Sequence, residues 1–137
     1  LGLAVITAVT SAPPGVGEPW PGEPIRVALS LVQLLAGEAY ADQIIAYDVR
    51  ERDERDRIHL VLYTEHGKVR WGLPPGQEQV LEERAAVKRQ WLRRVAAHHN
   101  GRVDAGGQVV ELFRAVIYVY QPAMQGDVVG TGYTSNR

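Results

Sequence analysis

The spacing of hydrophobic residues changes several times along this chain, and each change predicts a new element. Residues 3–9, LAVITAV, are short and β-branched, which is typical of a strand. Residues 11–24 carry five prolines and three glycines, so they are expected to form an irregular loop. Apolar positions then recur at helical spacing, and Pro24 and Gly37 suit the start and end of a helix. Its predicted apolar face consists of Ile25, Ala28, Leu29, Val32 and Leu35.

Three strand patterns follow the first helix and predict an antiparallel meander. In residues 43–51 two alternating sets compete, and the better core face consists of Ile45, Tyr47 and Val49 rather than Ile44, Ala46 and Asp48. The next strands are expected to bury Ile58, Leu60 and Leu62, and then Val69 and Trp71 after a tight turn at Gly67. Residues 50–57, RERDERDR, alternate in sign, which favours a solvated hairpin tip over a nucleic-acid patch.

Residues 77–100 have the pattern of a long amphipathic helix. Acidic residues crowd its first half and basic residues its second half, which complements the helix dipole. Asn100 and Gly101 form a good C-terminal stop. The expected buried stripe consists of Leu81, Ala85, Lys88, Leu92 and Val95.

Residues 107–122 give the strongest strand signal, long enough for one bent strand or two short ones. The whole pattern, β-α-β-β-β-α-β(β), predicts an α/β (α+β) domain with two helices on a mixed, mainly antiparallel sheet. We expect this domain to span residues 1–122. Residues 123–137, rich in Gly, Ser and Thr, are expected to form a flexible C-terminal tail.

Composition narrows the function classes. With a net charge of −1 in 137 residues, nothing favours nucleic acid or an anionic membrane. The chain has no cysteine, which removes disulfides, thiol catalysis and cysteine zinc sites. No apolar run reaches the roughly 18–20 residues that span a bilayer. Because the chain begins without Met or a basic segment, we expect it to come from the middle of a longer protein, so that any anchor or signal would lie upstream of it.

Catalytic and cofactor motifs are weak. The loop GLPPG, residues 72–76, lacks the lysine and Ser/Thr of a phosphate-binding loop, and acidic residues follow it. The adjacent His98 and His99 point about 100° apart on a helix and do not chelate one metal well. We therefore expect no enzyme activity, no cofactor and no metal. The alternative is a small ligand-binding or hydrolytic domain that uses the Pro-rich loop with His98 and His99.

The last strand pattern has two interpretations: its aromatic residues belong to the core and the sheet surface, or the strand is an edge held open for a partner. From residue 115 to residue 121 it has neither a charge nor a proline, the features with which monomers normally protect a sheet edge. Such an edge can accept a strand from another protein. The expected partner-binding residues are Ala115, Val116, Ile117, Tyr118, Val119 and Tyr120. A homo-oligomer using the same edge is the second possibility.

The order of these elements resembles the extracytoplasmic β domain of the FtsQ/DivIB cell-division proteins over residues 3–122. Its first strand and helix match LAVITAV and VALSLVQLLA, its hydrophobic–Asp strand matches IIAYDV, and its hairpin matches IHLVLYTEHGKVRWG. Lys88, Leu92 and Val95 match the second helix, and VVELFR and AVIYVYQP match the closing strands. Three features depart from the family: Ala8 replaces a turn glycine, the Pro-rich loop is unusual, and Glu111 replaces an Asp. An alternative register places that Asp at Asp104.

The resemblance implies a non-enzymatic scaffold of the divisome. Members are single-pass inner-membrane proteins in which a POTRA domain and then this β domain follow the membrane helix. They recruit the FtsB/FtsL coiled-coil pair, and the final strand of the sheet adds a partner strand. Carried over by position, that edge is again residues 115–120. The implied location is extracytoplasmic, with the membrane contacted only through an upstream anchor.

Overall fold

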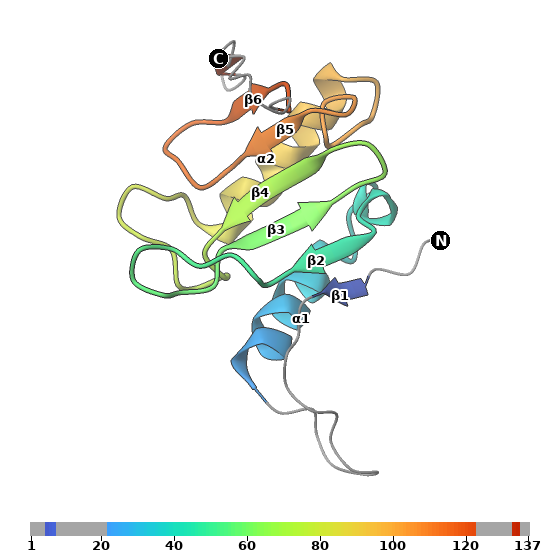
Figure 1. The fold of residues 1–137 in the computed structure, drawn as a ribbon. Coiled ribbons are helices and arrows are strands. Elements are labelled where there is room, and N and C mark those ends of the chain that lie inside the picture. The colour runs from blue at the N-terminus through green and yellow to red at the C-terminus, as the bar shows by residue number, and fades with distance from the viewer. Residues whose placement is uncertain (1–4, 8–21, 123–132, 135–137) are drawn as a thin grey trace.

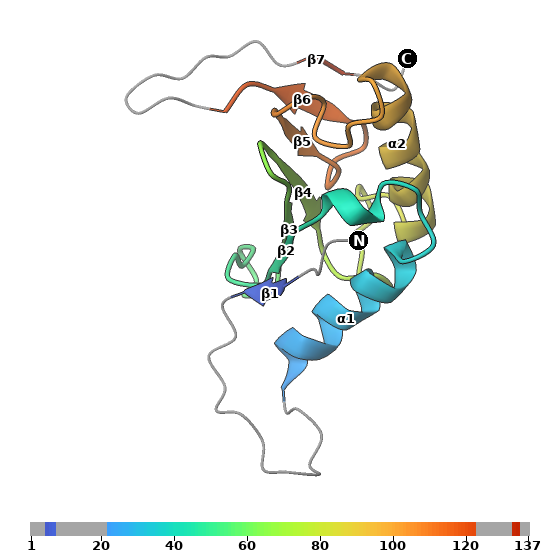
Figure 2. The ribbon, with the colours of Figure 1, turned by 90° about the vertical axis from the view of Figure 1, so that its right-hand side faces the viewer.

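The computed structural model describes residues 5–7, 22–122 and 133–134, which form a mixed sheet with two helices (Figure 1). The sheet has seven strands. Figure 2 shows both helices, α1 (Glu23–Leu35) and α2 (Ala85–His98), on the same face of the sheet. This arrangement confirms the predicted α+β class. In order along the chain and across the sheet, the strands are β1 (Val5–Thr7), β2 (Ala46–Asp48), β3 (Leu60–Tyr63), β4 (Lys68–Gly72), β5 (Val109–Glu111), β6 (Tyr118–Tyr120) and β7 (Tyr133–Thr134).

Two β-α-β units flank a central meander. β1 pairs in parallel with β2 across α1, and β4 pairs in parallel with β5 across α2. β2, β3 and β4 are antiparallel neighbours, as are β5, β6 and β7. The charged residues 50–57 join β2 to β3, as predicted, and a bridge between Arg52 and Ile58 closes this loop. The Pro-rich residues 11–21 lie outside the described part of the chain.

The first helix follows the prediction in its position but not in its rotation. Ala28 and Leu35 are buried as expected, but Leu29 is 43% exposed. Ile25 and Val32 are only partly covered. Helix α1 is apolar around much of its circumference, so periodicity alone could not choose between two overlapping stripes. The stripe that faces the sheet consists of Val27, Ala28, Leu31 and Leu35.

The faces of the central strands were mostly predicted correctly. Tyr47 and Val49 are buried, as are the expected residues of β3 and β4. The exception is Ile45, which is 46% exposed, whereas Ile44 is buried. The short 3₁₀ turn η1 (Ala41–Gln43) ends immediately before this pair, and β2 begins only at Ala46. The alternation of the strand therefore does not extend back to residues 44 and 45.

The second helix begins eight residues later than predicted, at Ala85 rather than residue 77. Carboxylates that were expected to lie on the helix instead bind the backbone of the preceding loop. Glu78 accepts hydrogen bonds from Gly76 N at 3.1 Å and from Ala85 N at 3.1 Å, and Glu82 accepts one from Leu73 N at 3.0 Å. Local side-chain bonds of this kind compete with helix formation. Leu81, predicted to be buried, is consequently 78% exposed in this loop.

A buried lysine connects α2 to this loop. Lys88 lies on the buried stripe as predicted, together with Ala85, Leu92 and Val95, and it is fully buried. Its Nζ donates to the carbonyl oxygen of Trp71 at 2.8 Å and to the carboxylate of Glu82. Burial lowers the pKa of Lys88, and the nearby Glu82 carboxylate opposes this shift. Each of these two buried charges is therefore balanced by the other, which offsets the cost of removing them from water.

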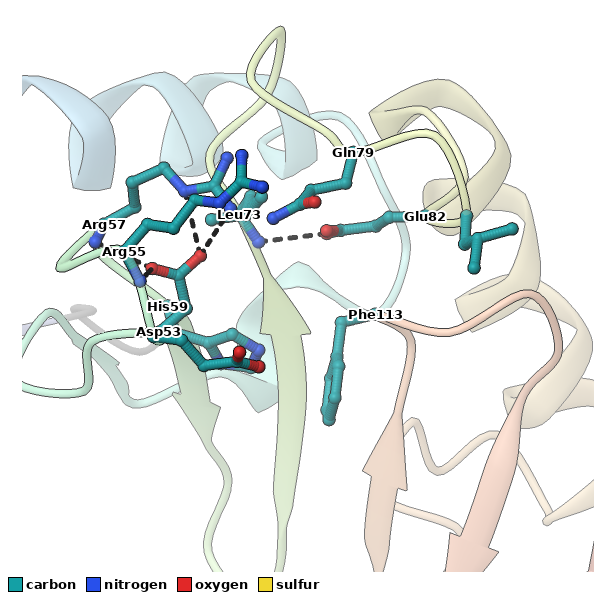
Figure 3. A pocket seen from close by; sticks show the side chains of 10 residues that line it. Asp53, Arg55, Arg57, His59, Leu73, Gln79, Glu82 and Phe113 are labelled. Carbon is teal, nitrogen blue, oxygen red and sulfur yellow. Dashed lines mark hydrogen bonds and ion pairs between the residues drawn. The ribbon is translucent and has the colours of Figure 1, made fainter.

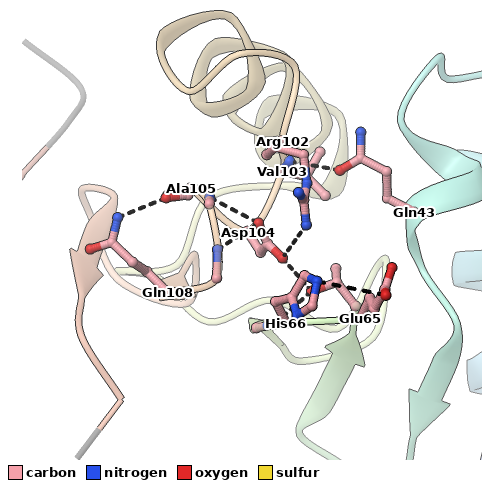
Figure 4. A network of polar contacts seen from close by, with 12 residues as sticks. Gln43, Glu65, His66, Arg102, Val103, Asp104, Ala105 and Gln108 are labelled. Atoms are coloured by element: carbon pink, nitrogen blue, oxygen red, sulfur yellow. Dashed lines mark hydrogen bonds and ion pairs between the residues drawn. The ribbon is translucent and has the colours of Figure 1, made fainter.

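A second polar centre lies at the opposite end of α2. Asp104 is fully buried in the loop that leads to β5 (Figure 4). It accepts hydrogen bonds from Thr64 Oγ1 at 2.6 Å and from the backbone N–H groups of Gly106 and Gly107 at 2.9 and 3.0 Å. The β3–β4 turn packs closely here, since a Cβ on Gly67 would overlap the carbonyl oxygen of Gln108. The glycine predicted to form the turn is therefore required by this close approach.

The C-terminal part of the domain contains two short strands, β5 and β6, rather than one bent strand. The predicted edge of residues 115–120 is correspondingly shorter. Ala115 and Val116 lie in the connecting hairpin and Ile117 precedes the strand, so only Tyr118–Tyr120 belong to β6. Tyr133–Thr134, in the expected flexible tail, form β7 and pair with β6. The remaining tail residues lie outside the described part of the chain.

Candidate functional site

The backbone of β6 presents its hydrogen-bonding groups alternately to its two neighbours. Lys68 N donates to Gln108 O at 3.1 Å and Leu112 N donates to Arg70 O at 2.9 Å. These two residues flank β5, so by alternation the backbone groups of Val110 also point toward β4. Val109 and Glu111 therefore face β6, where they pair with Tyr120 and Tyr118. It follows that Tyr118 and Tyr120 direct their backbone groups toward β5. Those of Val119 point to the outer edge.

The six predicted edge residues have different surroundings. Ile117 and Val119 are fully buried in the core cluster, so their side chains are not accessible to a partner. Tyr118 and Tyr120 are half-buried, and because side chains alternate along a strand they lie opposite the buried Val119, on the sheet face that carries no helix. Ala115 is exposed in the hairpin. An added strand would thus bind chiefly the backbone of β6, with side-chain contact from Tyr118.

The outer edge of β6 has a neighbour that the sequence analysis did not anticipate. β7 pairs with β6 through Tyr118↔Thr134 and Val119↔Tyr133. Figure 2 shows β7 beside β6 at the end of the sheet. The expectation that this edge is unprotected is therefore wrong for Tyr118 and Val119. The pairing also shows that the edge has the geometry to accept an antiparallel strand.

An ionic network fixes β6 against β5 on the helix-free face. Glu111 accepts hydrogen bonds from Arg70 Nη1 and Arg114 Nε, each at 3.1 Å, and from the hydroxyl of Tyr120. Arg70 also donates to Glu51 Oε1 at 2.8 Å. Burial by itself would raise the pKa of Glu111, but these hydrogen bonds and the two guanidinium charges outweigh it and lower the pKa. The edge strand is thus held in place by an ionised carboxylate.

A polar cavity of about 340 Å³ lies at the carboxyl ends of β4 and β5 (Figure 3). Its walls include Arg57, Glu82 and Phe113, and His59 contacts the Phe113 ring edge-to-face at 4.5 Å between centroids. Burial, and next the charge of Arg70, lower the pKa of His59, which favours the neutral imidazole. Its Nδ1 has no hydrogen-bond partner among the described residues. Among the described residues, no Ser, Thr or Lys lines this cavity.

His98 and His99, the two histidines of the alternative hypothesis, lie away from the cavity beside His59. His98 is exposed in the last turn of α2, and neither it nor His99 lines the cavity beside His59. A second cavity, of about 530 Å³, lies between the ends of the two helices and is also lined by neither histidine. Among the described residues, no group of three or more His, Asp and Glu could hold a metal ion. The Pro-rich loop of that hypothesis lies outside the described part of the chain.

The loop GLPPG is occupied by contacts within the chain. An anion at this loop would need the backbone N–H groups at the start of α2. Glu78 already accepts from Gly76 N and Ala85 N, and Glu82 accepts from Leu73 N. These carboxylates take the place that a phosphate group would need.

Comparisons with known proteins add no assignment: no family model matches the chain, and neither a curated protein nor a solved structure matches it. The resemblance to the FtsQ/DivIB family therefore stays a prediction. In the described ranges, neither helix is sufficiently long and apolar to span a membrane.

Sequence reasoning missed three parts of this site. Arg70 and Arg114 were not assigned a role, although Arg114 lies three residues after Glu111 in a strand-like pattern. Tyr133 was placed in a flexible tail. A strand of only two residues has no periodicity from which it could have been predicted.

Proposed function

We propose that this domain is a non-enzymatic protein-binding module that accepts a partner strand at the outer edge of β6. The observation that carries the proposal is the direction of the Val119 backbone. Its N–H and C=O point away from β5, toward the outer edge of the sheet. Main-chain pairing of this kind gives affinity without a deep pocket.

The surroundings of β6 support this role because they hold the strand rigidly from both faces. The side chain of Val119 is fully buried beneath it, and the Glu111 network fixes Tyr120 above it. A preorganised edge loses little conformational entropy when a partner strand binds.

The resemblance to the FtsQ/DivIB family suggests the partner. We propose that the added strand comes from a division protein of the FtsB or FtsL type, and that the domain lies on the extracytoplasmic side of the cell membrane. The whole protein would then act as a divisome scaffold, anchored by a segment upstream of this domain.

A pair of variants at Gln121 tests strand addition without disturbing the core. Gln121 is exposed and follows Tyr120, so its N–H continues the outward direction of Val119. Gln121→Pro removes this donor, whereas Gln121→Ala keeps it. Calorimetric titration with FtsB- and FtsL-type proteins of the same organism should show about a tenfold weaker Kd for the proline variant, corresponding to roughly one hydrogen bond. Equal binding by both variants would sink the mechanism.

Val119 provides a second pair at the centre of the edge. Val119→Pro removes both the outward donor and core packing, and Val119→Ala removes core packing alone. Partner binding should be lost in the proline variant and largely kept in the alanine variant, after both have been shown to fold by circular dichroism. Solution mass at varied concentration separates this reading from a homo-oligomer, which would form without any partner.

A further inference from the structure

We propose that β7 is a built-in occupant of the β6 edge, and that a partner strand binds by displacing it. This inference rests on the proposed function, since it concerns the regulation of the same edge. It starts from the pairing of β7 with Tyr118 and Val119, two of the residues at which strand addition is expected.

The alternation of the ladder defines which contacts β7 makes. Because the backbone groups of Val119 point outward, Val119↔Tyr133 is the hydrogen-bonded pair. Tyr118↔Thr134 is the non-hydrogen-bonded pair, so the N–H of Thr134 points away from β6. Tyr133 therefore occupies the same donor and acceptor on Val119 that a partner strand would use.

Strand β7 is short enough to be displaced from the edge of β6. β7 contributes two residues, and short two-stranded pairings are marginal in water. Its advantage is its covalent connection, which supplies an effective concentration on the order of mM. If β7 covers the edge nine-tenths of the time, the apparent Kd of a competing strand is raised about tenfold. A longer partner strand with micromolar affinity would still bind.

Two proline variants of the full chain distinguish loss of the bond between β7 and Val119 from the general effect of a proline in β7. Tyr133→Pro removes the N–H that pairs with Val119, whereas Thr134→Pro removes one that points away from the sheet and serves as the matched control. Amide hydrogen exchange at Val119, followed by NMR, reports on the remaining bond from Val119 N–H to the carbonyl oxygen of residue 133. Exchange should accelerate in Tyr133→Pro, because the pair has lost its other bond and opens more often, and should stay unchanged in Thr134→Pro. Unchanged exchange in Tyr133→Pro would overturn the inference, whatever the partner does.

Affinity measurements with the same variants test displacement. The Kd for the FtsB- and FtsL-type proteins should fall about tenfold in Tyr133→Pro and stay at the native value in Thr134→Pro. Faster exchange at Val119 without tighter binding would overturn the claim that the partner displaces β7.

A peptide probe distinguishes failure of this inference from failure of the proposed function. The peptide GTGYTSNR, residues 130–137, is added at millimolar concentration to Tyr133→Pro. Restored protection of the Val119 amide supports an edge that accepts β7 in trans, even if no division protein binds and the proposed function fails. No protection by the peptide overturns the assignment of β7 as the occupant.

Discussion

The hydroxyl of Tyr120 donates a hydrogen bond to the carboxylate of Glu111 across the β5–β6 hairpin. The bond is diagonal, because Tyr120 pairs with Val109 and Glu111 pairs with Tyr118. It therefore links the last residue of β6 to the last residue of β5 and stabilises the register of the edge strand. The same contact contributes to the lowered pKa of Glu111.

Tyr120→Phe should reduce the free energy of unfolding by about 1.5 kcal/mol. This value is at the lower end for a hydrogen bond to a charged group, because Glu111 still accepts hydrogen bonds from Arg70 and Arg114. Tyr118→Phe is the matched control, since it leaves the Tyr120–Glu111 bond intact and keeps the ring over which Arg114 lies. Urea denaturation of both variants measures the difference. Equal stability of the two variants would mean that the Tyr120–Glu111 bond does not hold the hairpin.

The buried pair of Lys88 and Glu82 should behave as a unit. Lys88→Met leaves the Glu82 carboxylate, 6% exposed, without its cation, at a cost of about 3–5 kcal/mol. Glu82→Gln together with Lys88→Met removes both charges, and its carbonyl oxygen keeps an acceptor for Leu73 N. The double variant should therefore be more stable than the sum of the single changes predicts. Additive losses in a double-mutant cycle would argue against coupling.

Asp104 should make stability depend on pH below the ordinary carboxyl range. Burial alone would raise its pKa, but the bonds from Thr64 and Gly107 outweigh burial and lower it. At a pH between the folded and unfolded pKa values, the unfolded chain binds more protons than the folded one. The contribution of Asp104 to the free energy of unfolding is therefore complete above the ordinary pKa of 3.8 and is lost as the pH falls through the folded pKa. Asp104→Asn should cost about 1–3 kcal/mol at pH 7. A deficit that stays constant down to pH 2 in denaturation curves would contradict this role.

Gly72, at the end of β4, should tolerate no side chain. Its φ is +106°, and a Cβ would overlap the carboxylate of Glu82. Gly72→Ala should cost at least about 2 kcal/mol, as expected for strained backbone with a steric clash. Gly37→Ala is the control, because nothing lies within 4 Å of a Cβ there. Thermal unfolding should show a clearly lower Tm for the Gly72 variant alone.

The sequence allowed the fold class to be predicted because most strands have clear alternation and both helices have apolar residues at helical spacing. Trp71 and Leu92 were placed correctly for this reason. The predictions failed where local hydrogen bonds compete with periodicity. Glu78 and Glu82 are good helix formers, but they bind backbone N–H groups before α2, and this choice depends on the tertiary position of Leu73 and Lys88.

The candidate site was predicted in part. The absence of charges in residues 115–121 led to the prediction of a binding edge there, which stays a prediction, but strand boundaries within this segment depend on the hairpin that Glu111 and Arg114 stabilise. Pairing between distant segments, such as Val119 with Tyr133, leaves no local pattern in the sequence. The occupancy of the edge could therefore be seen only in the folded sheet.

Strand addition at β6 is tested most directly by identifying which proton lies opposite the Hα of Tyr118 when the partner is bound. Tyr118 faces Thr134 in a non-hydrogen-bonded pair, in which opposing Cα atoms lie about 4.5 Å apart and the Hα atoms point toward each other. With a saturating, differently isotope-labelled FtsB- or FtsL-type protein, the account predicts an intermolecular Hα–Hα nuclear Overhauser effect from Tyr118 to the partner strand. A saturated complex in which Tyr118 shows no intermolecular contact and keeps its contact with Thr134 would contradict it.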